Sequence, residues 1–374
     1  MQEPANPLAH PTGSRKNSCR LSKALSFSSS SLLSEMKSVD AWQAAENALT
    51  CVYEAKKGES VTIFCDDVKT NVGEAFAAGS LRLGLRTHVI HLKTGNNIFR
   101  KEVSPDIVKI LVKQEPDIYI NLLRGIREET PFRMKFTRME MEKHRARLAH
   151  CPGVTLDMLT EGALALTIEE HKQMQTFAHS LMEKLSQATK VEITNPAGTE
   201  VSLSVEERPF ITDTIIDWET MKWTNLPTGE VYVAPVENSL EGRFVCDMAV
   251  GGIEPLKTSI ELSVKSGKVQ GISSTDTQVL SEVKDSLNTD GWSSVVGEFA
   301  FGINPKARFV EEFLESEKML GTVHIAFGGN MDMPGGKNCS GNHMDLLISK
   351  PTVRVFCRNG SSTTVLSDGM FERL

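Results

Sequence analysis

The chain has 374 residues, of which 40% are hydrophobic and 24% are charged, and its formal net charge is −7 at pH 7. A chain of this length can bury the cores of about two domains of ordinary size. The negative charge argues against a nucleic-acid-binding surface. No run of about eighteen apolar residues is present that could span a membrane. The composition therefore predicts an ordinary globular protein with neither nucleic acid nor membrane among its partners.

The seven cysteines are odd in number, widely scattered and without C-x-x-C spacing. Secreted domains that depend on disulfides have regular, paired cysteines. The cysteine pattern therefore predicts a reducing, cytoplasmic location.

Residues 1–38 are rich in Ser and Pro, and between Glu3 and Glu35 they include four basic residues and no acidic one. Such a composition predicts a disordered tail. An organellar transit peptide has a similar basic, Ser-rich character and stays open as an alternative, although no clear amphipathic helix is present.

From residue 39 to residue 188, helical and strand patterns alternate, which predicts βαβ units and a parallel sheet. No G-x-G-x-x-G follows the first strand, so no dinucleotide site is expected. Asp66 and Asp67, at the carboxyl end of that strand, are expected either to cap a helix or to bind a ligand in the crevice. The expected helices cover 41–55, 71–83, 105–114, 133–150 and 167–187, and the expected strands cover 60–66, 87–92 and 117–123.

From residue 189 to residue 374, β segments separated by Gly and Pro dominate, with helices expected at 274–288 and 307–314. NPAG at 195–198 and KSGK at 265–268 are turn signals between these segments. This change of pattern places a domain boundary near residue 188. The predicted fold class is α/β, with an N-terminal parallel-sheet domain (39–188) followed by a β-rich α+β metal-binding, catalytic domain (189–374).

The stretch from Gly321 to Val353 carries three potential metal ligands on two short apolar runs, which are joined by a loop rich in Gly, Asn and Pro. In the first run, VHIAF, His324 points to the face opposite its apolar neighbours if the run is a strand. His343 and Asp345 in the second run are two residues apart and therefore point to the same side. Two histidines and one carboxylate suit iron(II), and with further carboxylates the set also suits zinc, manganese or cobalt.

Two acidic residues upstream lie in similar settings. Glu230 in NLPTGEVYVAP and Glu298 in VVGEFAFGINP each follow a glycine and begin an alternating apolar run. A carboxylate that enters a buried strand is costly unless it is paired or bound to a metal. Asn330 and Asn338, in the loop between the two histidines, are expected to form turns or to orient ligands. The sequence thus predicts a divalent metal site made of Glu230, Glu298, His324, His343 and Asp345.

These motifs also carry a resemblance through their order. NLPTGEVYVAP, VVGEFAFGINP, GTVHIAFG and NxSxxHxD, preceded by CPGVT and GTEVSLSVEERP, follow one another between about residue 40 and the end of the chain. In this order they resemble the leucyl aminopeptidase T family of metallopeptidases. The resemblance implies a homodimer and a pair of divalent metal ions, with Glu298 as the bridging and catalytic carboxylate. The ligands that it implies are Glu230, Glu298, His324, His343 and Asp345.

The function implied by the resemblance is a metal-dependent aminopeptidase, which releases N-terminal amino acids from small peptides or aminoacyl substrates through a water activated by zinc, cobalt or manganese. One departure opens an alternative, because the aminopeptidases carry a tyrosine shortly after the first histidine and GGNMDMPGGKN has none. This loop also resembles a related branch that includes iron(II) dioxygenases opening dihydroxypyridine rings. In that alternative, His324, His343 and Asp345 would hold iron(II). A binding protein that kept the fold without turnover is a third hypothesis.

Overall fold

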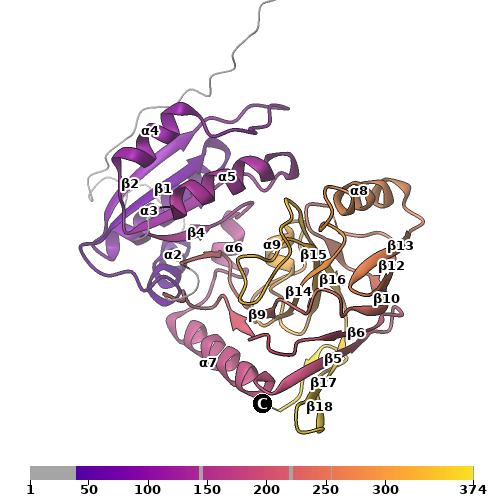
Figure 1. The fold of residues 1–374 in the computed structure, drawn as a ribbon. Helices are drawn as coiled ribbons and strands as arrows, with labels where there is room; N and C mark the ends of the chain where they lie inside the picture. The colour runs from indigo at the N-terminus through magenta and orange to yellow at the C-terminus, as the bar shows by residue number, and fades with distance from the viewer. Residues whose placement is uncertain (1–38, 143–145, 219–221, 254, 374) are drawn as a thin grey trace, which may run out of the picture.

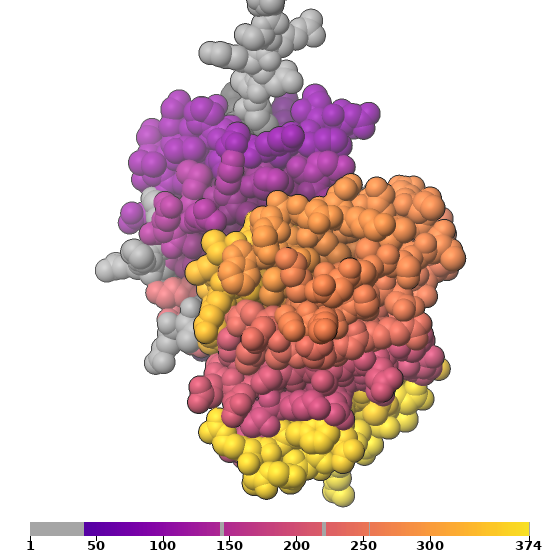
Figure 2. Space-filling view, turned by 45° about the vertical axis from the view of Figure 1, so that its right-hand side comes forward, coloured from indigo at the N-terminus to yellow at the C-terminus, as the bar shows by residue number. Residues whose placement is uncertain are grey.

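The computed structural model describes residues 39–142, 146–218, 222–253 and 255–373. Three sheets organise this part of the chain: a five-stranded parallel sheet, an eight-stranded antiparallel sheet and a six-stranded antiparallel sheet. In Figures 1 and 2, the indigo and purple N-terminal part lies against the magenta-to-yellow remainder. The predicted α/β class, a parallel-sheet region followed by a β-rich region, is confirmed.

The N-terminal part is a parallel sheet in the order β2-β1-β3-β4-β8 with helices on both faces. Helices α2, α3 and α6 share an apolar cluster with one face, and α4 and α5 share another cluster with the opposite face. The elements are α2 (Val39–Cys51), β1 (Ser60–Asp66), the 3-10 helix η1 (Asp67–Lys69), α3 (Thr70–Arg82), β2 (Arg86–Leu92), α4 (Pro105–Lys113), β3 (Ile118–Leu122), the 3-10 helix η2 (Arg127–Glu129), α5 (Thr130–Met141), β4 (Arg147–His150), α6 (Leu156–Thr160) and β8 (Trp223–Asn225).

The predicted helix over 133–150 is wrong in its second half. Helix α5 ends at Met141, and the RLAH segment forms strand β4, which pairs in parallel with β3 and β8. All four residues of this strand are buried, and the Arg147 side chain forms an ion pair with Glu59 at 2.6 Å. A strand this short shows no period of its own in the sequence, so only its pairing between two other strands reveals it.

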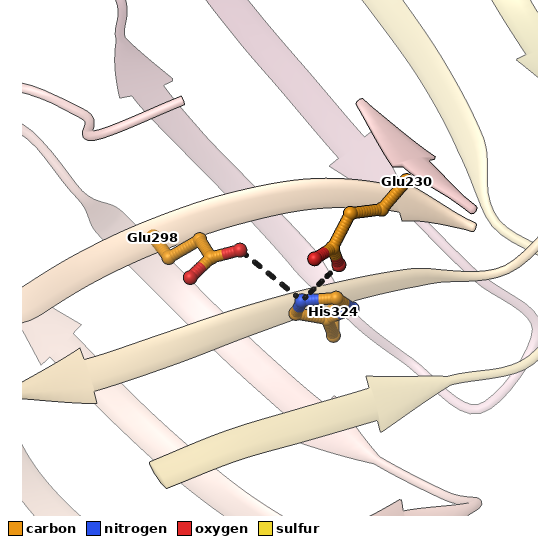
Figure 3. A group of neighbouring side chains, drawn as sticks. All are labelled: Glu230, Glu298 and His324. Carbon is orange, nitrogen blue, oxygen red and sulfur yellow. Dashed lines mark ion pairs between the residues drawn. The ribbon is translucent and has the colours of Figure 1, made fainter. Parts of the chain in front are cut away.

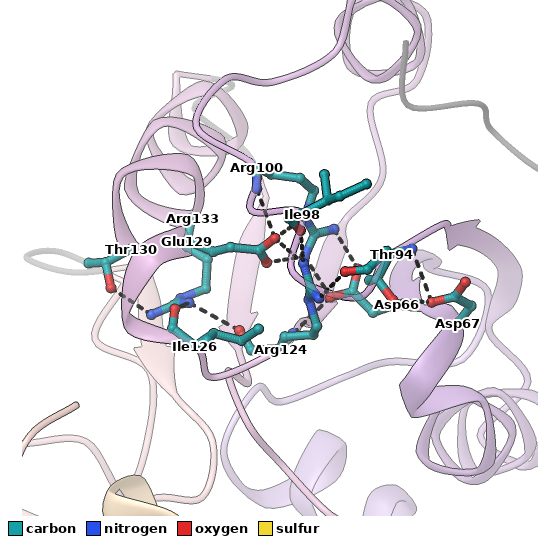
Figure 4. Close-up of polar contacts among 11 residues, drawn as sticks. Asp66, Asp67, Thr94, Ile98, Arg100, Arg124, Ile126, Glu129, Thr130 and Arg133 are labelled. Carbon is teal, nitrogen blue, oxygen red and sulfur yellow. Dashed lines mark hydrogen bonds and ion pairs between the residues drawn. The ribbon is translucent and has the colours of Figure 1, made fainter. Parts of the chain in front are cut away.

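Buried ion pairs close the carboxyl end of β1 and β3 (Figure 4). Arg100 contacts both oxygens of Asp66 at 2.6 Å and Glu129 at 2.5 Å, and Arg124 also pairs with Glu129. Asp66 is fully buried and makes no capping hydrogen bond to the helix that follows it. The crevice at this edge is therefore filled by the protein's own charged side chains.

The C-terminal part encloses one apolar core between α7 and the two antiparallel sheets. The larger sheet runs β13-β12-β10-β6-β5-β17-β18-β19, and the smaller runs β11-β16-β15-β14-β9-β7. The elements are α7 (Ile168–Leu185), β5 (Ala188–Thr194), β6 (Glu200–Ser204), β7 (Ile211–Thr212), β9 (Glu230–Val233), β10 (Glu241–Cys246), β11 (Ala249–Val250), β12 (Ile260–Lys265), β13 (Lys268–Ser273), α8 (Thr277–Leu287), β14 (Val296–Gly302), α9 (Phe313–Ser316), β15 (Val323–Gly328), β16 (His343–Ile348), β17 (Thr352–Cys357), β18 (Ser362–Ser367) and β19 (Met370–Phe371).

The helix predicted at 274–288 is confirmed as α8, whereas the one predicted at 307–314 is wrong. Only the single turn α9 is helical there. The residues before α9 are held by other partners, because the Val310 N–H donates to the Ser316 hydroxyl, which in turn donates to the Val310 carbonyl oxygen. These side-chain contacts compete with the backbone hydrogen bonds that a helix would need.

The domain boundary near residue 188 stays a prediction. Strand β8 lies beyond that residue and yet pairs with β4, so the later half of the chain adds one strand to the N-terminal sheet. The predicted tail, residues 1–38, lies outside the described residues. None of the helices in the described ranges is long and apolar enough to cross a membrane.

Candidate metal centre

The five residues predicted as ligands lie on one face of four neighbouring strands, β9, β14, β15 and β16. Residues paired across adjacent strands point to the same side of a sheet, and side chains alternate along each strand. Most partners of the predicted ligands are small, although His324 is also paired with Leu347 of β16. Glu230 is paired with Gly302, Glu298 and Asp345 with Ala326, His324 with Ala300, and His343 with Gly328.

The opposite face of the same strands belongs to the apolar core. Phe299, Ile325 and Leu346 alternate with the ligand positions and are fully buried in the cluster between the two antiparallel sheets. Burial of large apolar side chains on one face fixes the register of each strand, because a slip by one residue would expose all of them. The core therefore determines which way the ligands point.

A β-bulge turns Glu298 toward the ligand face. Val296 is paired with Phe327 and lies in the core, whereas Glu298, only two residues later, is paired with Ala326. Gly297 is the extra residue between them, and the register of β14 against β15 shifts there. In a regular strand Val296 and Glu298 would share a face. The bulge separates a core side chain from a ligand side chain within three residues.

The side chains converge above these strands. The His324 ring atom Nε2 lies 3.6 Å from Glu230 Oε2 and 3.4 Å from Glu298 Oε1 (Figure 3). The same atom is 3.8 Å from Asp345 Oδ1. His343 Nε2 lies 3.2 Å from Glu298 Oε2 and 3.2 Å from Asp345 Oδ1. Glu298 thus directs one carboxylate oxygen at each histidine.

Three overlapping sets of side chains have ligand atoms within 4.8 Å of one another. They are Glu230 with Glu298 and His324, Glu298 with His343 and Asp345, and Glu317 with His324 and Asp345. Each set combines carboxylate oxygens with imidazole nitrogen, which suits zinc, manganese, cobalt or iron(II). Glu298, His324 and Asp345 each belong to two sets, so the arrangement has room for more than one ion.

Three further residues join the centre that were not predicted from the sequence. Glu317 is buried and belongs to the third set of ligand atoms. Its neighbour Lys318 is also buried and forms ion pairs with Glu230, with Glu317 at 3.0 Å and with Asp213 at 3.6 Å. The sequence signal for the first two was the charged pair Glu317–Lys318, which is separated by four residues from the buried strand β15. Asp213 lies between the motifs GTEVSLSVEERP and NLPTGEVYVAP but in neither of them.

The proximity of these groups shifts their protonation. Burial opposes the positive charge on His324, but its contact with Glu298 and the negative charges around it raise the pKa of His324 to about 9. Burial raises the pKa of Glu230 to about 8, although the charge of Lys318 works against this shift. Burial also acts to raise the pKa of Glu298, but its contacts with the two histidines outweigh burial and lower it. Such opposed shifts among close groups are typical of functional sites.

Unpartnered buried atoms show that the donor set fits divalent metal ions. Glu230 Oε2 and His324 Nδ1 are buried and have no hydrogen-bond partner among the described residues. A buried carboxylate oxygen without a partner costs free energy. A cation beside His324 would provide a partner for Glu230 Oε2. His343 Nδ1 lies 2.8 Å from the carbonyl oxygen of Gly329, so Nδ1 donates to that oxygen and Nε2 is the nitrogen that faces the centre.

Comparison with known proteins agrees with this geometry. The family model for the thermophilic metalloprotease (M29) matches residues 165–371, which is more than half of the chain. The chain belongs to this M29 family. Family membership makes the protein a metallo-aminopeptidase, and therefore a hydrolase. No curated protein gives a significant sequence match.

Two solved structures share the fold of this M29 protein. The structure of wild-type AmpT from Thermus thermophilus has a TM-score of 0.67 at 17% identity and covers 89% of this chain and 98% of its own. The structure of 2,5-dihydroxypyridine dioxygenase from Pseudomonas putida KT2440 also has a TM-score of 0.67, at 16% identity, and covers 89% of this chain and 96% of its own. At these identities the similarity shows the fold alone.

The loop between the histidines of the M29 centre is held by two buried asparagines. The Asn338 side chain donates to the carbonyl oxygens of Val296 and Gly328, and the Asn330 side chain donates to that of Gly297. Asn330 also accepts a hydrogen bond from the Asn338 backbone at 2.8 Å. Asn330 and Asn338 therefore do both things that were expected of them. They shape the loop, and they brace the bulge that orients Glu298.

Proposed function

We propose that this protein is an aminopeptidase that releases N-terminal amino acids from small peptides or aminoacyl substrates by means of two divalent metal ions. The observation that supports this proposal is the placement of Glu298, whose two carboxylate oxygens face His324 and His343 at 3.4 Å and 3.2 Å. A carboxylate in this position can be shared by two ions, each with its own histidine. In the proposal, the metal ligands are Glu230, Glu298, His324, His343 and Asp345, with Glu317 as an additional candidate.

Charge balance also supports two ions rather than one. The centre contains five carboxylates and one ammonium, so with both histidines neutral its net charge is −4 when all carboxylates are ionised. Two divalent cations neutralise this charge without any bound proton, whereas with one cation the same balance requires two of the carboxylates or histidines to hold a proton. Buried charges without compensation are strongly unfavourable. The members of this count are Asp213, Glu230, Glu298, Glu317, Asp345 and Lys318.

In the proposed reaction, the bound metal ions would supply Lewis-acid chemistry, acidifying a water molecule and polarising the scissile carbonyl. Glu298 is the catalytic residue of the proposal, and Glu230 or Glu298 would help as a ligand or as the acceptor of the proton that the attacking water loses. His343 keeps its ring orientation through the Gly329 carbonyl, so its Nε2 faces the centre throughout. The positions above the small residues Ala300 and Ala326 would receive the substrate.

One observation favours a second candidate, an iron(II) dioxygenase that opens a dihydroxypyridine-like ring. The loop at 329–342 contains no tyrosine, although Tyr232 of β9 is buried on the ligand face, where it is paired with Ala300. In this candidate His324, His343 and Asp345 would hold one ion, which leaves Glu230 and Glu317 to share the ammonium of Lys318. With two ions the charge balance described above needs no bound proton, which favours the aminopeptidase.

Elemental analysis of protein purified without chelators, together with two activity assays, tests the proposal. We expect about two zinc, cobalt or manganese ions per chain and hydrolysis of aminoacyl p-nitroanilides that is lost after dialysis against a chelator and restored by metal. About one iron per chain, with oxygen consumption on 2,5-dihydroxypyridine and no hydrolysis, would overturn the aminopeptidase in favour of the dioxygenase. Absence of metal and of both activities would favour the binding protein.

Homodimeric assembly and a cytoplasmic location are part of the same proposal. The cysteines in the described ranges are free, in keeping with a reducing compartment. Light scattering of the purified protein tests the dimer, and a mass of one chain would contradict it.

A further inference from the structure

Lys318 is a fully buried cation at the edge of the metal centre. Its side chain is 1% exposed. Helix α9 ends at Ser316, and Glu317 and Lys318 are the next two residues. Its ammonium forms ion pairs with Glu230 Oε1, with Glu317 Oε1 at 3.0 Å and with Asp213 Oδ2 at 3.6 Å. A buried ammonium is tolerated only with such compensation. The three carboxylates around the ammonium supply this compensation.

Glu230 is shared between Lys318 and the metal centre. Its Oε1 pairs with Lys318, whereas its Oε2 lies 3.6 Å from His324 Nε2 and has no hydrogen-bond partner in the part of the chain that the structure describes. The backbone of Glu230 is fixed by the same cluster, because Asp213 Oδ1 accepts hydrogen bonds from the N–H groups of Gly229 and Glu230, each at 2.9 Å. Lys318 and Asp213 therefore hold both the side chain and the backbone of Glu230.

We infer that Lys318 is a positioning residue whose fixed positive charge acts on the metal site. It keeps one oxygen of Glu230 turned away from the metal ions, and it weakens metal binding at the position beside His324. The inference rests on the proposed metal site. A fixed positive charge that shares a carboxylate with a metal ion repels that ion and withdraws negative charge from the ligand. It also leaves Glu230 with a single free oxygen, which prevents that carboxylate from closing over the open positions that a substrate needs.

Metal titration of the full-length protein tests the inference. Wild type, K318M and the double variant K318M/D213N are stripped of metal by chelator dialysis and titrated with Zn²⁺ in competition with a fluorescent chelator. We expect K318M to bind one Zn²⁺ at least tenfold more tightly than wild type, because a positive charge is lost. In the double variant one negative charge is lost as well, so its affinity should return toward that of wild type. A change of ligand geometry alone would not produce this reversal.

The visible absorption spectrum of the Co²⁺-loaded proteins is a second readout, independent of turnover. Release of Glu230 Oε1 should alter the d–d bands of K318M relative to wild type. The matched control is K306M, which removes a lysine that pairs with Glu170 at 2.8 Å, outside the centre. It should leave both the affinity and the spectrum unchanged.

The outcomes separate this inference from the proposed function. If wild type binds no metal, the metal site itself is overturned and the role of Lys318 falls with it. If wild type binds metal and K318M has the same or a weaker affinity, only the role of Lys318 is overturned. If K318M does not fold, the double variant K318M/D213N decides the question, since it removes one charge of each sign. A Zn²⁺ affinity of the double variant within about threefold of wild type supports the inference. A Zn²⁺ affinity more than tenfold weaker than that of wild type contradicts it.

Discussion

Gly297 packs directly against the backbone of Gly328, and a Cβ atom placed at residue 297 would lie 2.7 Å from the carbonyl oxygen of Gly328. This contact is part of the bulge that separates Val296 in the core from Glu298 in the metal centre. The close approach of the two strands at a glycine is thus linked to the orientation of the carboxylate that faces both histidines.

The first prediction concerns this glycine. G297A should destabilise the protein by about 1–3 kcal/mol, because the added methyl group forces the two backbones apart. It should also lower the metal content, since movement of the bulge displaces Glu298. Thermal unfolding and elemental analysis measure the two effects. The control is G291A, because nothing lies within 4 Å of a Cβ at that residue. Equal melting temperatures and metal contents for both variants would contradict the role of the bulge.

The second prediction concerns the proposed ligands themselves. H343A should lose at least one metal ion per chain and most of its hydrolytic activity, with little change in fold, because the His343 side chain is 36% exposed and contributes little to the core. Circular dichroism and elemental analysis provide the readouts. H179A serves as the control, since His179 lies exposed on α7 and its Nδ1 is 2.7 Å from the carbonyl oxygen of Gln175, within the same helix. A metal content in H343A equal to that of H179A would remove His343 from the ligand set.

The third prediction is a pH dependence of metal binding. In the metal-free protein the pKa of His324 is raised to about 9, above its usual 6.5, so the ring holds a proton that a metal ion must displace. Apparent affinity should therefore rise by up to about tenfold per pH unit between pH 6.5 and 9 and then level off. The stabilising contribution of protonated His324 is present below pH 6.5 and is lost as pH rises through 9. Calorimetric titration across this range checks the slope, and a flat profile would refute it.

The fourth prediction concerns the ion-pair network of the N-terminal sheet. Burial opposes the charge on Glu129, but its hydrogen bonds from Arg100 and Arg124 lower its pKa to about 2. Its stabilising contribution is therefore present above pH 4.5 and is lost as pH falls through 2. E129Q should cost about 3–5 kcal/mol at neutral pH, because two arginines lose a buried partner.

Urea unfolding at several pH values measures the effect of E129Q. The control is E128Q at the exposed neighbouring residue, for which a change within about 0.5 kcal/mol is expected. If the two variants had the same stability at neutral pH, the network would be of no consequence for folding.

The sequence by itself determined the class of fold and proposed five of the candidate ligands, and local periodicity placed three of them, His324, His343 and Asp345, on strands. Alternating apolar residues identified β15 and β16, and a spacing of two placed His343 and Asp345 on one side. The same reasoning failed for β4, which is too short to show a period, and for 307–314, where side chains compete with helical hydrogen bonds.

Only the tertiary structure decided how the ligands meet and what surrounds them. The bulge at Gly297 depends on the register between β14 and β15, and the positions of Glu317, Lys318 and Asp213 depend on contacts between segments far apart in the chain. Such contacts leave no period in the sequence, because they are set by the packing of the core and by the compensation of buried charge. Local pattern thus determined which residues could bind metal, and packing decided which charges lie beside them.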